Sequence, residues 1–324
     1  MDTEHIMPNP FRDDRKQAIK KLRYLIYSSR QSPAVFRKKL DQAFYSPNVP
    51  QQVESVEMRV GTVFCEMLTP RVYSKNRLIF YVHGGSFVGG TSKAWRTFCA
   101  SLAHECAARL VIPNYRLAPA FAFPAAVEDL QDSFRELFNI ELAAAKKDML
   151  LPPELIIVGD SSGASLALAL LLNLREQIRM HIKQVVLFSP WVDMSSRSVF
   201  YSAKKNLADE IINAASYRTS ADLYTYMSNL TNPLVSPVWA DPANLRNFPP
   251  VYIQMGGAEL LLADVERFCD LLKRSNVSYT LDVWENMMHL FQMADEYLVE
   301  SHLAVKQVGD YVCKRSKPGG NVRE

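Results

Sequence analysis

The sequence predicts an α/β fold in which an eight-stranded, mostly parallel β-sheet carries helices on both faces and a helical cap. Three observations lead to this fold class. Strand-like and helix-like segments alternate along the chain, which is typical of a parallel sheet covered on both faces. An apolar run, 155–158, leads through a glycine-flanked serine, Ser161, into a second apolar segment, 164–172. The length of 324 residues suits one large domain with a modest additional lobe.

The predicted sheet begins with an antiparallel pair of strands at 55–60 and 62–68, separated by Gly61. Further strands are expected at 78–82, 110–113, 155–158, 185–188, 251–255 and 279–284. Helices are expected at about 94–107, 124–138, 162–179, 260–275 and 295–313. In such an open sheet, the site is expected at the carboxyl ends of the strands.

Two segments fall outside this alternation, residues 1–50 and 195–235. We expect both to form a helical cap, or lid, over the site, and the second to contain a helix around 221–230. The catalytic core then comprises residues 51–194 and 236–318.

The first of these segments contains a basic amphipathic helix with Ala18, Leu22 and Leu25 on one face. A second helix is expected to begin at Ser32-Pro33, a pair that suits the cap and first position of a helix. The simplest alternative for the basic helix is a solvated face packed on the domain. Binding to a membrane surface is less favoured, because the positive charge is interrupted by Asp13, Asp14 and Asp41.

Composition excludes several classes of protein. The formal net charge of +3 is too small to indicate a nucleic-acid partner. The five cysteines are scattered without a Cys-x-x-Cys pair, which favours reduced thiols in a cytoplasmic protein over a disulfide framework or a zinc site. The amino terminus does not resemble a signal peptide, and the longest apolar stretch is too short to span a bilayer. We expect neither a metal nor an organic cofactor.

The most informative motif is Gly159-Asp160-Ser161-Ser162-Gly163, which follows the apolar run 155–158. A serine between two glycines on a strand-to-helix turn forms a nucleophile elbow. The turn lifts the hydroxyl clear of the backbone towards a base, which an unactivated serine needs to act as a nucleophile. The sequence therefore predicts Ser161 as a nucleophile.

The segment His83-Gly84-Gly85 directly follows the strand at 78–82. It matches loops whose backbone N–H groups, with the N–H after the nucleophile, bind an oxyanion. A phosphate-binding loop is the alternative, but no Gly-Lys-Ser/Thr follows and the glycine spacing does not fit a dinucleotide site. We therefore expect an oxyanion hole here, with the ring of His83 supporting the loop.

His289 is the expected base because it lies in a loop just after the strand at 279–284, where the last member of a Ser, acid, His order belongs. Two carboxylates after the strand at 251–255 compete for the role of the acid, Glu259 and Asp264. The dipole of the following helix explains an acidic residue at Asp264 but not at Glu259. Glu259 is therefore favoured, and Asp264 stays as the alternative.

The chain resembles the hormone-sensitive-lipase-like branch of α/β-hydrolase esterases over roughly residues 50 to 315. The motifs that carry the resemblance occur in the family's order: His83-Gly84-Gly85, Tyr115-Arg116-Leu117-Ala118-Pro119, Phe123-Pro124-Ala125-Ala126-Val127-Glu128-Asp129, the Ser161 elbow, Ser189-Pro190-Trp191-Val192-Asp193 and Met288-His289. The resemblance implies the α/β-hydrolase fold, a triad of Ser161, Glu259 and His289, and an oxyanion hole formed by Gly84, Gly85 and Ser162.

The sequence departs from the family pattern at four positions. Ser86 replaces the third glycine of the His-Gly-Gly-Gly loop, and Ala164 follows the elbow where a glycine is usual. Ala120 and Asn286 replace two acidic residues usual near the loop and the catalytic histidine. None removes a backbone N–H, so these changes bear on positioning, rate and pH profile more than on the reaction class.

The expected function is a serine carboxylesterase acting on small to medium apolar esters. The apolar residues near the site, Phe87, Trp191, Met288 and Phe291, are the expected substrate pocket. An amidase, a lactonase or a carbamate hydrolase would use the same triad, and a receptor of this fold that has lost catalysis is the alternative from another class. A homodimer paired through the edge strand 279–284 is compatible with any of these.

Overall fold

The computed structural model describes residues 14–315, apart from 48, 50, 51, 149, 150, 196, 197 and 199–208. Predictions that concern residues 1–13, including the polar amino terminus, lie outside the described residues. So does part of the expected insertion at 195–235. Of Arg315 only the backbone is described.

The described chain forms one eight-stranded sheet in the order β1-β2-β4-β3-β5-β6-β7-β8. The strands are β1 (Val53–Val60), β2 (Val63–Pro70), β3 (Arg77–Val82), β4 (Arg109–Pro113), β5 (Glu154–Asp160), β6 (Ile182–Phe188), β7 (Val251–Gly256) and β8 (Tyr279–Trp284). β2 pairs antiparallel with β1 and β4, and every other pair is parallel. The predicted eight-stranded, mostly parallel sheet is therefore confirmed, and β8 lies at one edge.

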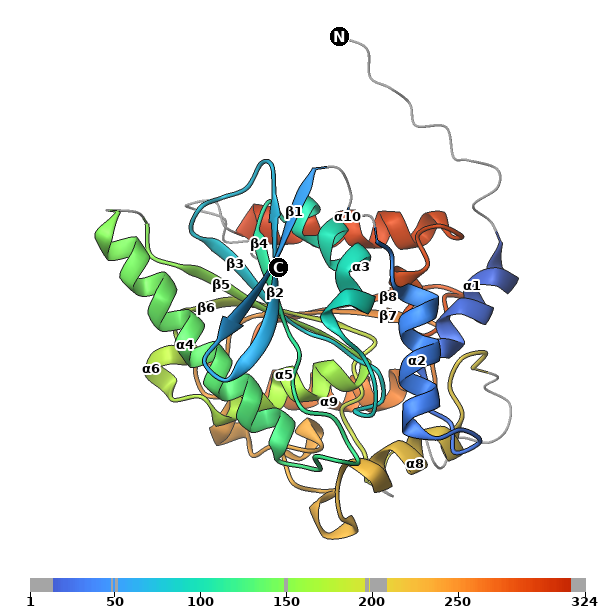
Figure 1. Ribbon diagram of the computed structural model, residues 1–324. Helices are drawn as coiled ribbons and strands as arrows, with labels where there is room; N and C mark the ends of the chain where they lie inside the picture. Colours follow the sequence, from blue (N-terminus) through green and yellow to red (C-terminus); the bar gives the residue numbers. More distant parts are fainter. Residues whose placement is uncertain are drawn as a thin grey trace.

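Helices cover both faces of this sheet (Figure 1). One layer contains α3 (Ser92–Glu105) and α10 (Val299–Arg315), which pack against each other. The other contains α4 (Ala125–Lys147), α5 (Ser161–Asn173) and α9 (Leu262–Arg274). Because both faces are covered, every residue of β3 and β7 is buried, as expected for central strands that read as continuous apolar runs.

Three predicted helices differ from the structure. The helix expected at about 124–138 continues to Lys147 in α4. The helix expected at 162–179 ends at Asn173, because Leu174 and Arg175 adopt extended ψ angles of 140°, and the short α6 (Glu176–Arg179) follows. The helix expected around 221–230 is wrong in position. The structure has α8 (Ala214–Tyr224), followed by the 3-10 turn η2 (Met227–Asn229).

The start of α8 is fixed by a cap that the sequence reading missed. The side chain of Asn213 accepts a hydrogen bond from the N–H of Ser216 at 2.9 Å, as an N-cap residue does. Three further 3-10 turns complete the carboxyl-terminal half: η3 (Pro237–Trp239), η4 (Pro242–Leu245) and η5 (Phe291–Met293).

The amino-terminal segment forms α1 (Arg15–Leu22), η1 (Arg23–Leu25) and α2 (Pro33–Phe44). Ser32 caps α2 through the N–H of Val35 at 3.3 Å, as predicted from the Ser32-Pro33 pair. The face expected to be apolar is buried, with residues Ala18, Leu22 and Leu25, and so are Phe36, Leu40 and Phe44 of α2. Arg23 donates to the carbonyl oxygen of Glu210 at 2.9 Å, which joins this segment to the chain that leads into α8.

None of the helices in the described part of the chain is long and apolar enough to cross a membrane. All five cysteines carry free thiols, and four of them are buried.

Candidate active site

Ser161 lies on the sharp turn between β5 and α5. It adopts a φ of 48°, a left-handed conformation that is strained for any residue with a Cβ. The turn also brings α5 close to β3. A Cβ added to Gly163 would lie 2.2 Å from the carbonyl oxygen of Val82, and one added to Gly159 would lie 2.8 Å from that of Gly163. The two glycines of the motif are therefore required by close backbone approach.

The fold brings Ser161, His289 and Glu259 into one hydrogen-bonded chain. The Oγ of Ser161 lies 3.1 Å from the Nε2 of His289, and the Nδ1 of His289 lies 2.7 Å from the Oε2 of Glu259. All three side chains are buried, and neither His289 nor Glu259 exposes its side chain to solvent. They reach this point from the carboxyl ends of β5, β7 and β8, where a site in an open parallel sheet is expected.

Asp264 has different partners. Its carboxylate pairs with Arg267 at 3.0 Å and accepts a hydrogen bond from Ser198. Arg267 also pairs with Asp193 at 2.9 Å. The geometry therefore favours Glu259 over Asp264 as the partner of His289.

Ser189 supports both members of the buried pair. Its hydroxyl donates to the Oε1 of Glu259 at 2.7 Å and accepts from the N–H of Leu290 at 3.2 Å. The N–H of Gly256 donates to the same Oε1. With Oε1 held by two donors, the other carboxylate oxygen is directed at His289.

The loop after β3 and the start of α5 carry the predicted oxyanion-binding residues. Ser162 is the second residue of α5, so its N–H has no partner within the helix and is directed towards the site. The N–H of Gly85 makes no hydrogen bond in the part of the chain described here. The N–H of Gly84, however, donates to the Oδ1 of Asp160 at 2.9 Å. Since that N–H is already used, Gly84 does not act as the free donor that the motif suggested.

Asp160 anchors this loop from beneath. Its Oδ1 also accepts from the hydroxyl of Tyr81 at 2.8 Å and the Nε1 of Trp95 at 2.9 Å. Burial raises the pKa of Asp160 to about 6, although these donors oppose the shift. The carboxylate thus connects the residue before the nucleophile to β3, α3 and the oxyanion loop.

The ring of His83 supports the loop, as expected. Its Nδ1 lies 2.8 Å from the carbonyl oxygen of Gly84, and the ring stacks on Tyr115 at a centroid distance of 4.4 Å. Burial lowers the pKa of His83 to about 4, so the imidazole is neutral and its Nδ1 donates to that carbonyl. His83 is therefore a structural group here.

The amino-terminal helices are bonded directly to the same loop. The N–H of Tyr27 donates to the hydroxyl of Ser86 at 3.1 Å, and Arg37 donates to the carbonyl oxygens of Val88 at 2.7 Å and Ala118 at 3.0 Å. Ser86 has a φ of 59°, a conformation for which glycine is the usual residue. The departure from the third glycine therefore supplies an acceptor for the amino-terminal segment.

An aromatic cluster covers Ser161. Phe87 stacks on Tyr224 of α8 at 4.0 Å and contacts Trp191 at 5.5 Å, and Trp191 packs against Tyr217 at 4.2 Å between ring centroids. The N–H of Trp191 donates to the carbonyl oxygen of Ser161 at 3.2 Å. Phe87 and Trp191, two predicted pocket residues, therefore lie close to the turn that carries Ser161.

The other two predicted pocket residues lie in the chain around His289. Met288 directly precedes the histidine and is buried, and Phe291 packs against Trp284 at 5.5 Å. No ring contact in the described residues joins Phe291 to the cluster of Phe87 and Trp191. Within the same residues, no group of three or more histidine, cysteine, aspartate or glutamate side chains is arranged to hold a metal ion.

Comparison with known proteins identifies the family. A family model described as alpha/beta hydrolase fold matches residues 79–293. The chain belongs to this α/β-hydrolase fold family. The match contains the oxyanion loop, the elbow and His289, so the resemblance inferred from the motifs is confirmed.

This α/β-hydrolase is similar to several esterases and acetyl-hydrolases along most of its length. A protein named "Esterase" from Acinetobacter venetianus is 28% identical over 285 residues, which cover 86% of this chain and 88% of the relative. An "Acetyl-hydrolase" from Streptomyces hygroscopicus is 28% identical over 253 residues, which cover 78% and 80%. An esterase of the bacterial hormone-sensitive lipase (HSL) family has a similar crystal structure, with a TM-score of 0.81, 27% identity, and coverage of 93% and 98%. The esterase EstE5, from crystals soaked with p-nitrophenyl butyrate, gives a TM-score of 0.77 with 26% identity, covering 93% and 97%.

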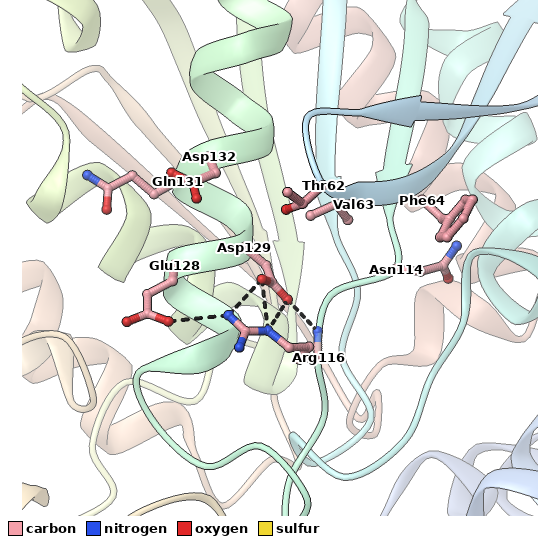
Figure 2. A pocket seen from close by; sticks show the side chains of 9 residues that line it. All are labelled: Thr62, Val63, Phe64, Asn114, Arg116, Glu128, Asp129, Gln131 and Asp132. Atoms are coloured by element: carbon pink, nitrogen blue, oxygen red, sulfur yellow. Dashed lines mark hydrogen bonds and ion pairs between the residues drawn. The ribbon is translucent and has the colours of Figure 1, made fainter.

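A separate pocket of the α/β-hydrolase lies between the start of β2 and the start of α4, and no triad residue lines it (Figure 2). Figure 2 shows Arg116 between the carboxylates of Asp129 and Glu128. The N–H of Arg116 also donates to Asp129 at 2.8 Å. These bonds fix the loop whose Ala118 donates its N–H to the carbonyl oxygen of Phe87 at 3.0 Å, so the motif around Arg116 shapes the oxyanion loop from outside.

The sequence reading missed three residues of this site. Ser189 and Asp160 were recognised only as parts of motifs, and their bonds to Glu259 and Gly84 depend on contacts between distant segments. Tyr217 was not recognised at all, although its hydroxyl lies within 3.4 Å of Ser161. The local signal that could have found it is Asn213, a cap residue that marks the start of α8.

Proposed function

We propose that this protein is a serine carboxylesterase that hydrolyses small to medium apolar esters. The observation that carries the proposal is the chain of hydrogen bonds from Ser161 through His289 to Glu259. Its relatives named esterases and acetyl-hydrolases support the same reaction class. The roles of nucleophile, base and orienting acid go to Ser161, His289 and Glu259 respectively.

In the first half of the reaction, the Oγ of Ser161 forms a bond to the ester carbonyl carbon while the Nε2 of His289 takes its proton. The carbonyl oxygen becomes an oxyanion and accepts hydrogen bonds from the N–H groups of Gly85 and Ser162. The carbon–oxygen bond to the alcohol then breaks, and the alcohol leaves with the proton from His289. An acyl group stays on Ser161.

In the second half, water occupies the place of the alcohol and gives its proton to His289 as it attacks the acyl carbon. The bond to Ser161 breaks, and the serine recovers its proton. Glu259 stays ionised throughout and stabilises the imidazolium that forms twice in each cycle.

The substrate class follows from the surroundings of the nucleophile. Phe87, Trp191 and Tyr217 form an aromatic cluster that reaches Ser161 through Tyr217, which favours apolar acyl and alcohol groups. Ser161 is 3% exposed and His289 is fully buried, so an ester reaches them only when covering side chains move. A cap made of residues 1–50 and 195–235 remains part of this proposal, as do the cytoplasmic location and a homodimer through β8.

The test is hydrolysis of p-nitrophenyl esters from acetate to laurate by the wild-type protein and by Ser161→Ala. Ser101→Ala is the matched control, because Ser101 lies on α3 and, within the described residues, its hydroxyl bonds only to the carbonyl oxygen of Thr97 in the same helix. We expect activity that is greatest at short to medium acyl chains in the wild type and the control, and none above background in Ser161→Ala.

A serine-directed sulfonyl fluoride, followed by peptide mass mapping, gives a second readout that does not depend on the substrate. Labelling at Ser161 without hydrolysis of any ester would refute the carboxylesterase and favour the amide, lactone or carbamate substrates that use the same triad. Neither labelling nor hydrolysis in a folded protein would refute the serine mechanism and favour a ligand-binding role.

A further inference from the structure

Tyr217 brings a second hydroxyl to the pair of Ser161 and His289. Its hydroxyl oxygen lies 3.4 Å from the Oγ of Ser161 and 3.3 Å from the Nε2 of His289. Since Oγ and Nε2 are themselves 3.1 Å apart, the three atoms form a nearly equilateral triangle. Tyr217 comes from α8, outside the sheet and its two helical layers (Figure 1).

The fold holds this tyrosine in place at both ends of α8. At the amino-terminal end, Asn213 caps the helix, and the ring of Tyr217 packs against Trp191. Two turns later Tyr224 stacks on Phe87, and its carbonyl oxygen accepts from the N–H of Phe123 at 2.7 Å. Residues seven apart share one face of a helix, so the same face of α8 supplies both contacts.

The position of the ring hydrogen on His289 allows the hydroxyl of Tyr217 to act as a hydrogen-bond donor. An ionised Glu259 requires the Nδ1 of His289 to carry a hydrogen, so the Nε2 of the neutral ring only accepts. The hydroxyl of Ser161 can transfer its proton only if Nε2 is available to accept it. The hydroxyl of Tyr217 can therefore donate to Nε2 in competition with Ser161, or to Oγ itself, and both contacts are long for hydrogen bonds.

In the proposed reaction, the position next to both Oγ and Nε2 is that of the alcohol oxygen of the ester. The ester oxygen of the alcohol is bonded to the carbon that Oγ attacks, and it must accept a proton from Nε2 as it leaves. The alcohol oxygen therefore belongs within reach of both atoms. In the free protein, the hydroxyl of Tyr217 occupies that region.

We propose that Tyr217 is a catalytic residue on the alcohol side of the ester and donates a hydrogen bond to the leaving oxygen. The inference rests on the proposed esterase function. When substrate enters, the hydroxyl yields its place to the ester oxygen and turns to donate to it. As the carbon–oxygen bond breaks, its electron pair goes to that oxygen, which takes the proton from Nε2. Tyr217 keeps its own proton and stabilises the developing charge.

The test compares two butyrate esters that share an acyl group and differ in the alcohol. p-Nitrophenolate is a stable anion that needs little help to leave, whereas ethoxide is a strong base that leaves poorly without it. The quantity to measure is kcat/KM, which reports the steps up to departure of the alcohol and excludes deacylation. Tyr217→Phe removes the hydroxyl and keeps the ring against Trp191.

Tyr224→Phe is the matched control. It removes a buried hydroxyl from the same face of α8, and that hydroxyl has no hydrogen-bond partner among the described residues. We expect Tyr217→Phe to lower kcat/KM for ethyl butyrate by about 10- to 100-fold, the ordinary range for a hydrogen bond to a developing charge. For p-nitrophenyl butyrate we expect a loss of less than about 3-fold, because little charge needs stabilising there. Tyr224→Phe should change both esters by the same factor.

Three outcomes would overturn the inference. Equal losses for both esters in Tyr217→Phe would show that the tyrosine only supports the structure. A gain with both esters would show that its hydroxyl only blocks the site. A wild-type protein inactive on both esters would refute the proposed esterase function first, and the role of Tyr217 with it.

Discussion

Replacement of Glu259 by glutamine should disable the base without disturbing the fold. The Oε1 of Glu259 accepts from Ser189 and from the N–H of Gly256, so a glutamine at this position must keep its carbonyl oxygen there. Its NH₂ group then faces the Nδ1 of His289, where the carboxylate oxygen lies 2.7 Å away in the wild type. That donor forces Nδ1 to accept and moves the ring hydrogen to Nε2.

A ring protonated at Nε2 cannot take the proton of Ser161, and no carboxylate remains to stabilise an imidazolium. Loss of the correct tautomer lowers kcat by roughly 10⁴-fold, which corresponds to about 5.5 kcal/mol of transition-state stabilisation. The assay is steady-state hydrolysis of p-nitrophenyl butyrate near neutral pH. Urea unfolding of each variant shows whether the fold survives.

Asp264→Asn is the matched control, because it neutralises the other candidate acid. Asp264 pairs with Arg267, which keeps Asp193 as a second partner. We expect this variant to lose roughly 1–3 kcal/mol of stability and to keep kcat within about 3-fold of the wild type. The reasoning fails if Glu259→Gln retains more than about a tenth of the wild-type kcat, or if Asp264→Asn is the more damaging change.

Three other perturbations test the supports of the site. Ser189→Ala leaves the N–H of Leu290 without its acceptor and removes one donor from the triad acid, so kcat should fall about 10-fold and urea unfolding should show a loss of roughly 1–3 kcal/mol. Gly163→Ala puts a Cβ 2.2 Å from a carbonyl oxygen of β3 and should cost about 3 kcal/mol or more, so a normal unfolding midpoint would contradict the elbow geometry. Burial raises the pKa of Asp160 from 3.8 to about 6, so the wild type loses stability as pH rises through that range. As the pH rises from about 4 to about 7, the free energy of unfolding of Asp160→Asn should therefore increase by about 3 kcal/mol relative to that of the wild type. A difference between the two proteins that stays constant across that range would refute the raised pKa.

The sequence predicted those features that depend on local pattern. Central strands such as β3 and β5 are continuous apolar runs because both faces of the sheet are covered, so their positions could be read directly. Ser161 and His289 could be located because each follows a strand whose carboxyl end lies at the same edge of the sheet. Neither prediction depended on contacts between segments that are distant in the sequence.

The features that escaped prediction depend on which distant segments meet. The N–H of Gly84 is used by Asp160, 76 residues away, and no local pattern indicates that bond. The preference for Glu259 over Asp264 depends on contacts between distant segments, because Glu259 bonds to Ser189 and His289, whereas Asp264 pairs with Arg267 of its own helix. The position of α8 depends on the Asn213 cap, and the helix expected around 221–230 leaves Tyr217 outside it.

The contrast between the supports of the triad and the contacts of α8 bears on how substrate enters. The carboxylates of Asp160 and Glu259 are held by three and two protein donors respectively, in addition to the bond between Glu259 and His289, so the catalytic groups are fixed to the core. The described contacts of α8 with the oxyanion loop are ring contacts, chiefly Tyr224 on Phe87, which can slide or separate without loss of a hydrogen bond. A movement that also separates Tyr224 from Phe123 breaks one backbone hydrogen bond, against the five that hold the carboxylates of Asp160 and Glu259. Because Ser161 is almost fully covered, something must move during each turnover, and the lower cost lies on the side of α8. Movement there also shifts the hydroxyl of Tyr217 out of the alcohol position, so the same displacement would admit the ester oxygen and leave the hydroxyl beside it as a donor.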